Sequence, residues 1–301
     1  MDTKLFIHKV KNQQPNQGDR HYWTAPLTSP QMLNFMREQC RGWRNIWTGG
    51  EREKEGSMEG SMTETQQHRL EPSMWISGLG STTQLHYDVK DNILCQLEGK
   101  KRVRVWRRGV KGFIMYPDAH GRARKSQLPL SSTLPPPSLD FVISGQDNEA
   151  VSIPAFCLHH VEVIDGPSVS VNVFGGSTIG GRASELLGNL GGGKEGVGGA
   201  RDVLEAIVGD RGGDVLRTCL ERYRVMGVEG VGGGGEGGGG VDIDNVTEMV
   251  RYFRDALEGE EGDEDDEGVV DLVAAHALEI MAVRATGGRD LGRIRGFLEA
   301  L

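Results

Sequence analysis

Residues 74–174 carry a series of short segments in which apolar and polar side chains alternate, and this pattern limits the possible folds more than any other feature of the chain. Alternation with a period of two is typical of β-strands that bury one face. Turn-forming residues separate the segments, which are spaced as in a β-sandwich or barrel. We expect Gly99 to form a hairpin turn between two of the strands. The expected strands are 74–80, 83–89, 92–97, 102–106, 140–144, 150–156, 159–164 and 168–174.

The chain divides into four parts by composition. Residues 1–70 form a mixed N-terminal segment, with a short strand expected at 4–10, a helix beginning at Ser29-Pro30 and an exposed loop at 49–68. The β-rich core follows at 71–176. Residues 177–240 read as a Gly-rich linker with one helical stretch, since more than half of the 45 glycines lie between Gly175 and Gly240. Residues 241–301 are helical by periodicity and include an acidic loop.

The charge balance excludes a uniformly basic nucleic-acid-binding coat, because the formal net charge is −9. A local basic patch is still compatible with this net charge. The four cysteines lack metal-ligand spacing and are expected to be reduced thiols. We expect an intracellular protein, cytoplasmic or nuclear, with no membrane contact, because the chain shows neither a signal-peptide pattern nor a run of about 18 apolar residues. The C-terminal helices are a candidate surface for a homodimer.

The segment "LHYDV" is a candidate half of a metal site. On a strand, alternation places His86 and Asp88 on one face and their neighbours on the other. A third ligand is available from the tandem histidines His159 and His160, at the start of a later strand. Two imidazoles and one carboxylate form the set that non-haem Fe(II) oxygenases use, although Zn²⁺ and Mn²⁺ accept the same ligands. The alternative is that these polar residues only satisfy hydrogen bonds within the strands.

The two segments "MWISGLGSTTQLHYDVKDNILCQLEGKKRVRVW" and "VSIPAFCLHHVEVIDGPSVSVNVF" resemble the JmjC or cupin-like family of Fe(II)- and 2-oxoglutarate-dependent oxygenases. The resemblance rests on the pattern Thr-x-x-His-x-Asp, a following Asn, Gly-x-Lys, a later Pro-x-x-x-x-His and an Asn on the last strand. It covers residues 74–176 and implies a mainly β protein, whose core is a double-stranded β-helix (jelly-roll, cupin-like). It also implies a dioxygenase that uses Fe(II), 2-oxoglutarate and O₂ to hydroxylate a substrate.

The resemblance also implies a role for each matching residue. His86, Asp88 and His159 match the iron ligands, so they are the expected catalytic and metal residues, with His160 beside them as a wall residue. Lys101 matches the lysine that pairs with the distal carboxylate of 2-oxoglutarate, while its neighbour Lys100 is expected to face solvent. The remaining expected cofactor-binding residues are Thr83, Asn92 and Asn172.

The substrate class stays open between several branches of the family. The residues of the motifs "HYDVKDN" and "GKKRV" are similar to those of the tRNA wybutosine-synthesizing hydroxylase, which makes a modified tRNA nucleoside the first candidate substrate. Two alternatives are a protein side chain, as for the asparaginyl hydroxylase of hypoxia-inducible factor, and a methylated lysine. A non-catalytic cupin-like binding protein is the alternative of another class. The basic residues between Lys100 and Lys125 either contact phosphates or simply face water.

Overall fold

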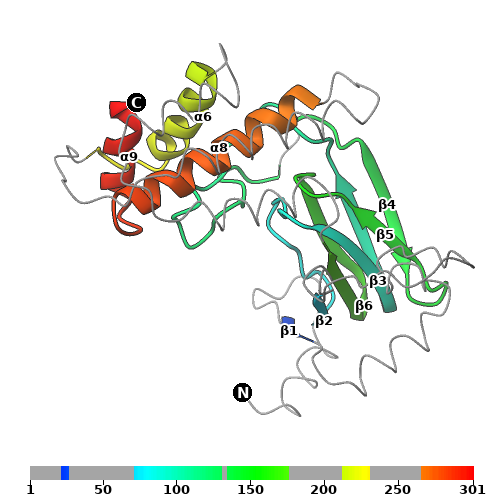
Figure 1. The fold of residues 1–301 in the computed structure, drawn as a ribbon. Coiled ribbons are helices and arrows are strands. Elements are labelled where there is room, and N and C mark those ends of the chain that lie inside the picture. Colours follow the sequence, from blue (N-terminus) through cyan, green and yellow to red (C-terminus); the bar gives the residue numbers. More distant parts are fainter. Residues whose placement is uncertain (1–21, 27–70, 131–133, 176–211, 231–265) are drawn as a thin grey trace, which may run out of the picture.

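The structure, a computed structural model, describes residues 22–26, 71–130, 134–175, 212–230 and 266–301 (Figure 1). Several expected elements therefore lie outside the description. They are the strand at 4–10, the helix from Ser29, the loop at 49–68, most of the Gly-rich linker, and the part of the expected helical region at 241–265 with most of its acidic loop.

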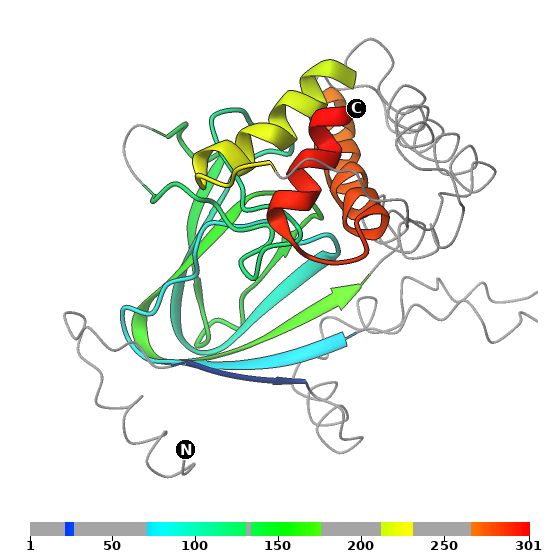
Figure 2. The same ribbon diagram turned by 90° about the vertical axis from the view of Figure 1, so that its left-hand side faces the viewer.

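The described strands form one antiparallel sheet in the order β1-β2-β6-β3-β4, with β5 also paired to β3. The sheet curls strongly, as Figure 2 shows. The two central strands, β3 and β6, pair along most of their length and therefore build the wall of the cavity described below. The strand bounds are β1 Tyr22–Pro26, β2 Glu71–Ser77, β3 Asp91–Val105, β4 Leu139–Ser144, β5 Ala150–Ile153 and β6 His159–Gly175.

The hairpin expected at Gly99 is wrong. The segments 92–97 and 102–106 belong to the single strand β3, and Gly99 lies within it at a β-bulge. The register between β3 and β6 shifts three times between Gln96 and Lys101. A bulge adds a residue to one strand, so the inward-facing positions change parity. Asn92 and Leu94 line the cavity before the bulge, and Lys101 lines it afterwards. A strictly alternating strand would have turned Lys100 inward instead.

Gly99 is required at this bulge, and Gly99→Ala is expected to lower the free energy of unfolding by about 3 kcal/mol. Its φ is +72°, and an added Cβ would lie 2.6 Å from the Asp165 carbonyl oxygen, which is backbone and cannot rotate away. Gly121→Ala is the matched control, because nothing lies within 4 Å of its added Cβ. We expect the control to change stability by less than about 0.5 kcal/mol in urea denaturation. Equal effects of the two substitutions would contradict the bulge assignment.

Three described helices pack together beside the sheet (Figure 1). They are α6 Gly212–Val225, α8 Asp266–Ala285 and α9 Leu291–Ala300, and each falls in a stretch whose periodicity predicts a helix. Their apolar faces share one core with loop residues of the β-rich part, including Leu85 and Tyr87. The antiparallel β-sandwich core followed by helices confirms the predicted fold class. None of the described helices is long and apolar enough to cross a membrane. The homodimer through these helices stays a prediction.

A buried polar network ties α6 and α8 to the loop that follows β3. Arg222 of α6 pairs with Glu279 of α8 at 2.9 Å between Nη1 and Oε1, and the side chains are 3% and 0% exposed. The other Glu279 oxygen accepts a hydrogen bond from the backbone N–H of Asp118, at 2.6 Å. The Asp118 carboxylate in turn lies 2.7 Å from Nδ1 of His276 in α8. These four residues are called the helix–loop network below, because they hold the loop against the helices.

Candidate metal centre

The segment around His86 is not the regular strand that alternation predicts. It forms isolated bridges instead, with His86 paired on one side to His159 and on the other to Lys125. The His86 N–H donates to the His159 carbonyl at 3.1 Å, and the His159 N–H donates back at 2.7 Å. The expected division of faces still holds. Leu85 and Tyr87 are buried in the core shared with the helices, whereas His86 and Asp88 line a cavity.

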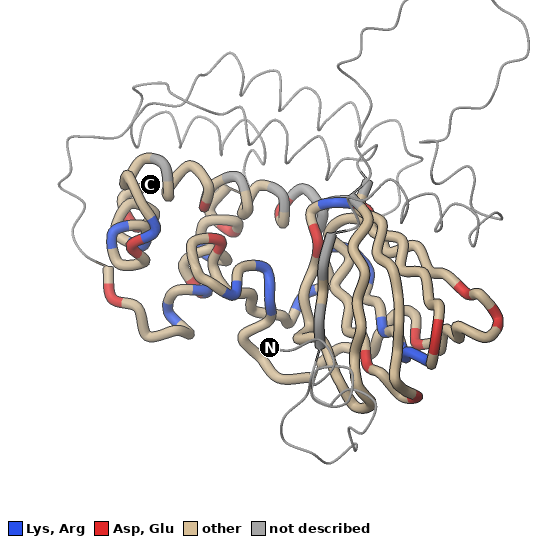
Figure 3. Tube along the Cα trace, turned by 90° about the horizontal axis from the view of Figure 1, so that it is seen from below, with Lys and Arg blue, Asp and Glu red and all other residues tan. Residues whose placement is uncertain are grey.

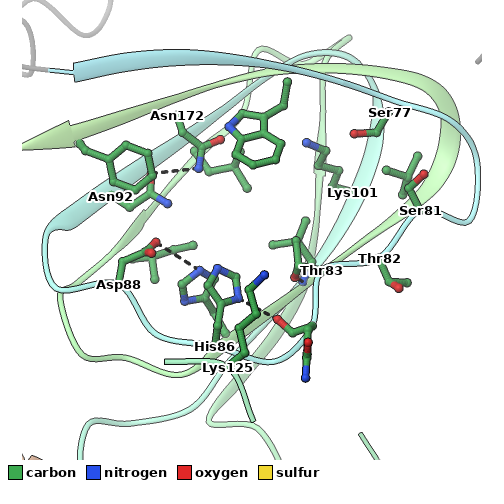
Figure 4. Close-up of a pocket in the computed structure, with 18 residues that line it drawn as sticks. Ser77, Ser81, Thr82, Thr83, His86, Asp88, Asn92, Lys101, Lys125 and Asn172 are labelled. Carbon is green, nitrogen blue, oxygen red and sulfur yellow. Dashed lines mark hydrogen bonds and ion pairs between the residues drawn. The ribbon is translucent and has the colours of Figure 1, made fainter. Parts of the chain in front are cut away.

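His86, Asp88 and His159 come together in this cavity, and Figure 4 labels the first two of them. One ligand atom from each lies within 4.8 Å of the others. Nε2 of His159 lies 3.6 Å from Oδ2 of Asp88. Residues 73 positions apart in sequence are brought together because β6 starts beside the His86 bridge. The arrangement can bind a metal ion from one side and leaves the cavity side open.

Both imidazoles are oriented for metal binding by backbone carbonyls. The His86 Nδ1 lies 2.8 Å from the Gln84 carbonyl oxygen, and the His159 Nδ1 lies 3.0 Å from the Cys157 carbonyl oxygen. A carbonyl only accepts, so each Nδ1 carries a proton and Nε2 is the ring nitrogen that remains available to a metal. Burial, and secondly the neighbouring His159, lower the pKa of His86 to about 3. A neutral imidazole is the form that binds metal, so the donor set fits a divalent ion such as Fe(II), Mn²⁺ or Zn²⁺.

Lys101 enters the same cavity from β3, across from the three candidate ligands (Figure 4). It is 5% exposed, and its ammonium donates to the Ser170 hydroxyl. Within the described residues no carboxylate lies at ion-pairing distance from it. Burial lowers its pKa to about 8. A buried ammonium without a counter-ion is costly, and a bound carboxylate would remove that cost. The cavity encloses about 320 Å³, which is room for a small acid.

The other expected cofactor-binding residues also line this cavity: Thr83, Asn92 and Asn172. The Asn172 amide donates to the Asn92 side-chain oxygen at 3.1 Å, across β6 and β3. The Thr83 hydroxyl oxygen accepts from the Val161 N–H at 2.9 Å, which leaves its own proton free to point into the cavity. The structure thus brings all seven residues singled out in the sequence to one cavity. Their roles toward metal and co-substrate stay a proposal.

His160 is not among the residues that line the cavity. Its ring lies on the other face of β6, where Nδ1 is 3.4 Å from Nη1 of Arg104. Burial, and secondly Arg104, lower the pKa of His160. Alternation along β6 explains the difference, because successive side chains point to opposite faces of the sheet. The two neighbouring histidines therefore lie in different surroundings.

Sequence reasoning did not single out Ser170, the partner of Lys101, nor Lys125 as a residue of the cavity. The alternation of "SVSVNV" could have indicated that Ser170 shares a face with Asn172. Lys125 had no such signal, because only the bridge to His86 brings it there. The structure also divides the basic residues between Lys100 and Lys125, whose role the sequence left open. Arg102 and Arg104 form ion pairs on the sheet surface with Asp140 and Glu162.

Comparison with known proteins adds a family. Residues 1–174 match the family model described as cupin-like domain. No curated protein matches the chain. Similar solved structures include the Escherichia coli ribosomal oxygenase YcfD in complex with cobalt and 2-oxoglutarate, at 15% identity and a TM-score of 0.26, covering 40% of this chain and 27% of that one. KdgF from Halomonas sp. is 13% identical with a TM-score of 0.23, covering 35% and 68%. The chain spans less than a third of the YcfD chain.

Proposed function

The chain belongs to the cupin-like domain family, and from this premise we propose that it is an Fe(II)- and 2-oxoglutarate-dependent oxygenase. In this proposal His86, Asp88 and His159 hold the metal, and Lys101 binds the distal carboxylate of 2-oxoglutarate. The donor set alone suits several metals and many reactions. The activity and the substrate therefore depend on what else the cavity can bind.

Lys101 is the observation that carries the proposal. Its ammonium is buried in the same cavity as the candidate metal ligands and has no carboxylate partner within the described residues. A five-carbon dicarboxylate that reaches the metal through its keto acid end would supply one. Thr83 can donate a second hydrogen bond, and the Asn92–Asn172 pair adds amide groups on the opposite wall. These contacts favour an acid with two charged ends over a neutral ligand.

Bound iron with O₂ would supply the oxidation, in which a substrate C–H becomes C–OH while 2-oxoglutarate becomes succinate and CO₂. The chain's own residues do the rest. Lys101, which is held by the Ser170 hydroxyl, fixes one end of the co-substrate, and the two backbone carbonyls orient the imidazoles through Nδ1. The apolar side chains of Leu94, Ile153 and Val163 line the same cavity and limit its water content.

Lys101→Ala is expected to weaken 2-oxoglutarate binding by about 100-fold, because a buried charge-assisted pair is lost. Lys100→Ala is the matched control, since Lys100 is adjacent but does not line the cavity, and we expect a change below about twofold. The measurement is anaerobic titration of the Fe(II)-loaded protein, followed by the visible charge-transfer band of the iron–2-oxoglutarate chelate. Equal effects of the two substitutions would place the co-substrate carboxylate elsewhere.

For the substrate we propose a modified tRNA nucleoside, with a protein side chain as the alternative. The support is a set of cations in residues 107–125, among them the cavity-lining Lys125, that form no ion pair within the described residues. The competing interpretation is that the same cavity belongs to a non-catalytic binding protein. Succinate formation from 2-oxoglutarate under O₂, lost on removal of the metal by a chelator, decides between enzyme and binding protein. Metal and 2-oxoglutarate binding without any succinate would favour the binding protein.

A further inference from the structure

Lys125 shares a cross-strand row with two of the candidate metal ligands. His86 is bridged to His159 on one side and to Lys125 on the other, in both cases antiparallel. Side chains of directly opposed residues point to the same face of a sheet. Lys125 therefore projects to the face of the histidines, and it lines the cavity beside them (Figure 4). Its main chain is held firmly, because the Ser126 N–H donates to the Leu85 carbonyl at 2.8 Å and the Gln84 amide donates to the Ser126 carbonyl at 2.6 Å.

With metal and 2-oxoglutarate bound, Lys125 would be the one charged residue lining the cavity whose charge is not balanced. Within the described residues it forms no ion pair, and it is exposed at the cavity rim. The other charged lining residues are Asp88 and Lys101. A divalent metal with Asp88, together with Lys101 and the dianion of 2-oxoglutarate, is neutral as a set. The ammonium of Lys125 is then left over at the side where a substrate must enter, and an anionic substrate group would balance it.

Lys125 ends a strongly basic loop. Residues 107–125, called the basic loop here, contain six Lys or Arg side chains and one acid, Asp118. That acid belongs to the buried helix–loop network, where it contacts His276, and a single carboxylate leaves the loop with a large excess of positive charge. Figure 3 shows several Lys and Arg positions where the sheet meets the helices. Within the part of the chain that is described, no ion pair is formed by five of these cations: Arg108, Lys111, Arg122, Arg124 and Lys125.

The basic loop also offers an aromatic pair. The rings of Tyr116 and His120 are stacked, with centroids 4.7 Å apart and planes at 13°, and the Arg122 guanidinium lies 5.8 Å from the centre of the Tyr116 ring. Both rings are half-buried, so part of each stays accessible. Cations combined with ring faces are typical of surfaces that bind single-stranded nucleic acid, where bases stack and phosphates pair with Lys and Arg. An acidic peptide would use the cations but not the rings.

We propose that Lys125 binds a phosphate of a single-stranded nucleic acid substrate at the rim of the metal cavity, with the basic loop holding the neighbouring phosphates. This proposal rests on the proposed function, because it assigns the substrate class of that same site. The helix–loop network acts as a positioning device, since it anchors the middle of the loop through Asp118. On the other side, the Gln127 amide donates to the Arg222 carbonyl of α6 at 2.9 Å.

The test uses the full chain loaded with Mn²⁺ and 2-oxoglutarate without O₂, so that no turnover occurs. The probe is a fluorescent single-stranded oligoribonucleotide of about ten nucleotides, with an oligoglutamate peptide of equal charge as the comparison. Binding is followed by fluorescence anisotropy at several salt concentrations. We expect Lys125→Ala to weaken oligoribonucleotide binding about five- to tenfold and to lower the slope of log affinity against log salt by about one. Lys125→Arg is expected to keep most of the affinity.

Arg102→Ala is the matched control, because Arg102 is a surface cation already paired with Asp140, and we expect it to change the affinity less than about twofold. A second measurement locates the site. The ³¹P relaxation of inorganic phosphate should be faster with Mn²⁺ than with Zn²⁺ in the metal site, and Lys125→Ala should abolish the difference.

Each of the other outcomes is decisive. Equal affinity for oligoglutamate would overturn the nucleic acid class in favour of an acidic protein. A loss of 2-oxoglutarate affinity in Lys125→Ala, as large as that in Lys101→Ala, would overturn the assignment, because Lys125 would then serve the co-substrate. Equal effects of Lys125→Ala and Arg102→Ala would show that the nucleic acid is attracted by overall positive charge, and the phosphate site at Lys125 would be wrong. If the wild-type chain binds neither metal nor 2-oxoglutarate, the proposed oxygenase fails, while oligoribonucleotide binding by the same variants still tests Lys125 separately.

Discussion

Asp88→Ala is expected to weaken metal binding by more than about 100-fold and to reduce succinate formation to background. The carboxylate is the charged member of the donor set, and it lies 3.6 Å from Nε2 of His159. Without it, two neutral imidazoles remain, which compensate none of the charge of a divalent ion. The measurement is calorimetric titration with Mn²⁺ and with anaerobic Fe(II), beside succinate detection by mass spectrometry.

His160→Ala is the matched control for the metal site. It removes an imidazole that is adjacent in sequence to a candidate ligand but lies on the opposite face of β6, beside Arg104. We expect metal affinity to stay within about threefold of wild type, because the donor atoms are untouched. If instead His160→Ala abolished metal binding and Asp88→Ala did not, the candidate site would be wrongly assigned. Circular dichroism of both variants shows whether a loss comes from unfolding.

Glu279→Leu is expected to lower the free energy of unfolding by about 3–5 kcal/mol, because it leaves the Arg222 guanidinium buried without its partner. The pair is almost completely buried, and the same carboxylate also accepts the Asp118 backbone N–H. Burial acts on both groups, but Glu279 and Arg222 stabilise each other's charged forms. The measurement is chemical denaturation followed by tryptophan fluorescence, with the midpoint and slope fitted together.

Two further variants separate the buried pair from charge in general. Glu221→Ala removes the exposed partner of Arg224 on the same helix, and we expect a loss below about 1 kcal/mol. The double substitution Arg222→Met with Glu279→Leu is expected to recover much of the stability lost in the single variant, since no charge is then left buried. A Glu279→Leu effect as small as that of Glu221→Ala would show that water reaches the pair. The helices would then not hold the loop as the structure describes.

Local pattern in the sequence was enough for two of the three candidate metal ligands. His86 and Asp88 are two residues apart, and alternation puts them on one face whether the segment forms a strand or only isolated bridges. The periodicity of the C-terminal stretches likewise predicted α8 and α9, because burial of one helix face repeats within a few residues. What such a pattern cannot contain is the distance between segments. That His159 meets His86 was supplied by the family resemblance, and the pairing along β6 gives the physical reason.

The sequence by itself determined the β-rich core and the helical end, because these follow from local periodicity, whereas most residues of the cavity were indicated by the family resemblance. The family resemblance favoured Lys101 over Lys100, but strict alternation along the strand favours Lys100, and only the tertiary structure gives the physical reason why Lys101 turns inward. The bulge at Gly99 changes the parity of β3, and the choice of Lys101 depends on contacts with Asp165 and Ser168 far along the chain. It also decided that Lys125 lies beside His86, while Arg102 and Arg104 are paired on the sheet. Whether a charged side chain is free to bind a ligand depends on whether the fold places an opposite charge beside it, and the order of residues alone does not show this.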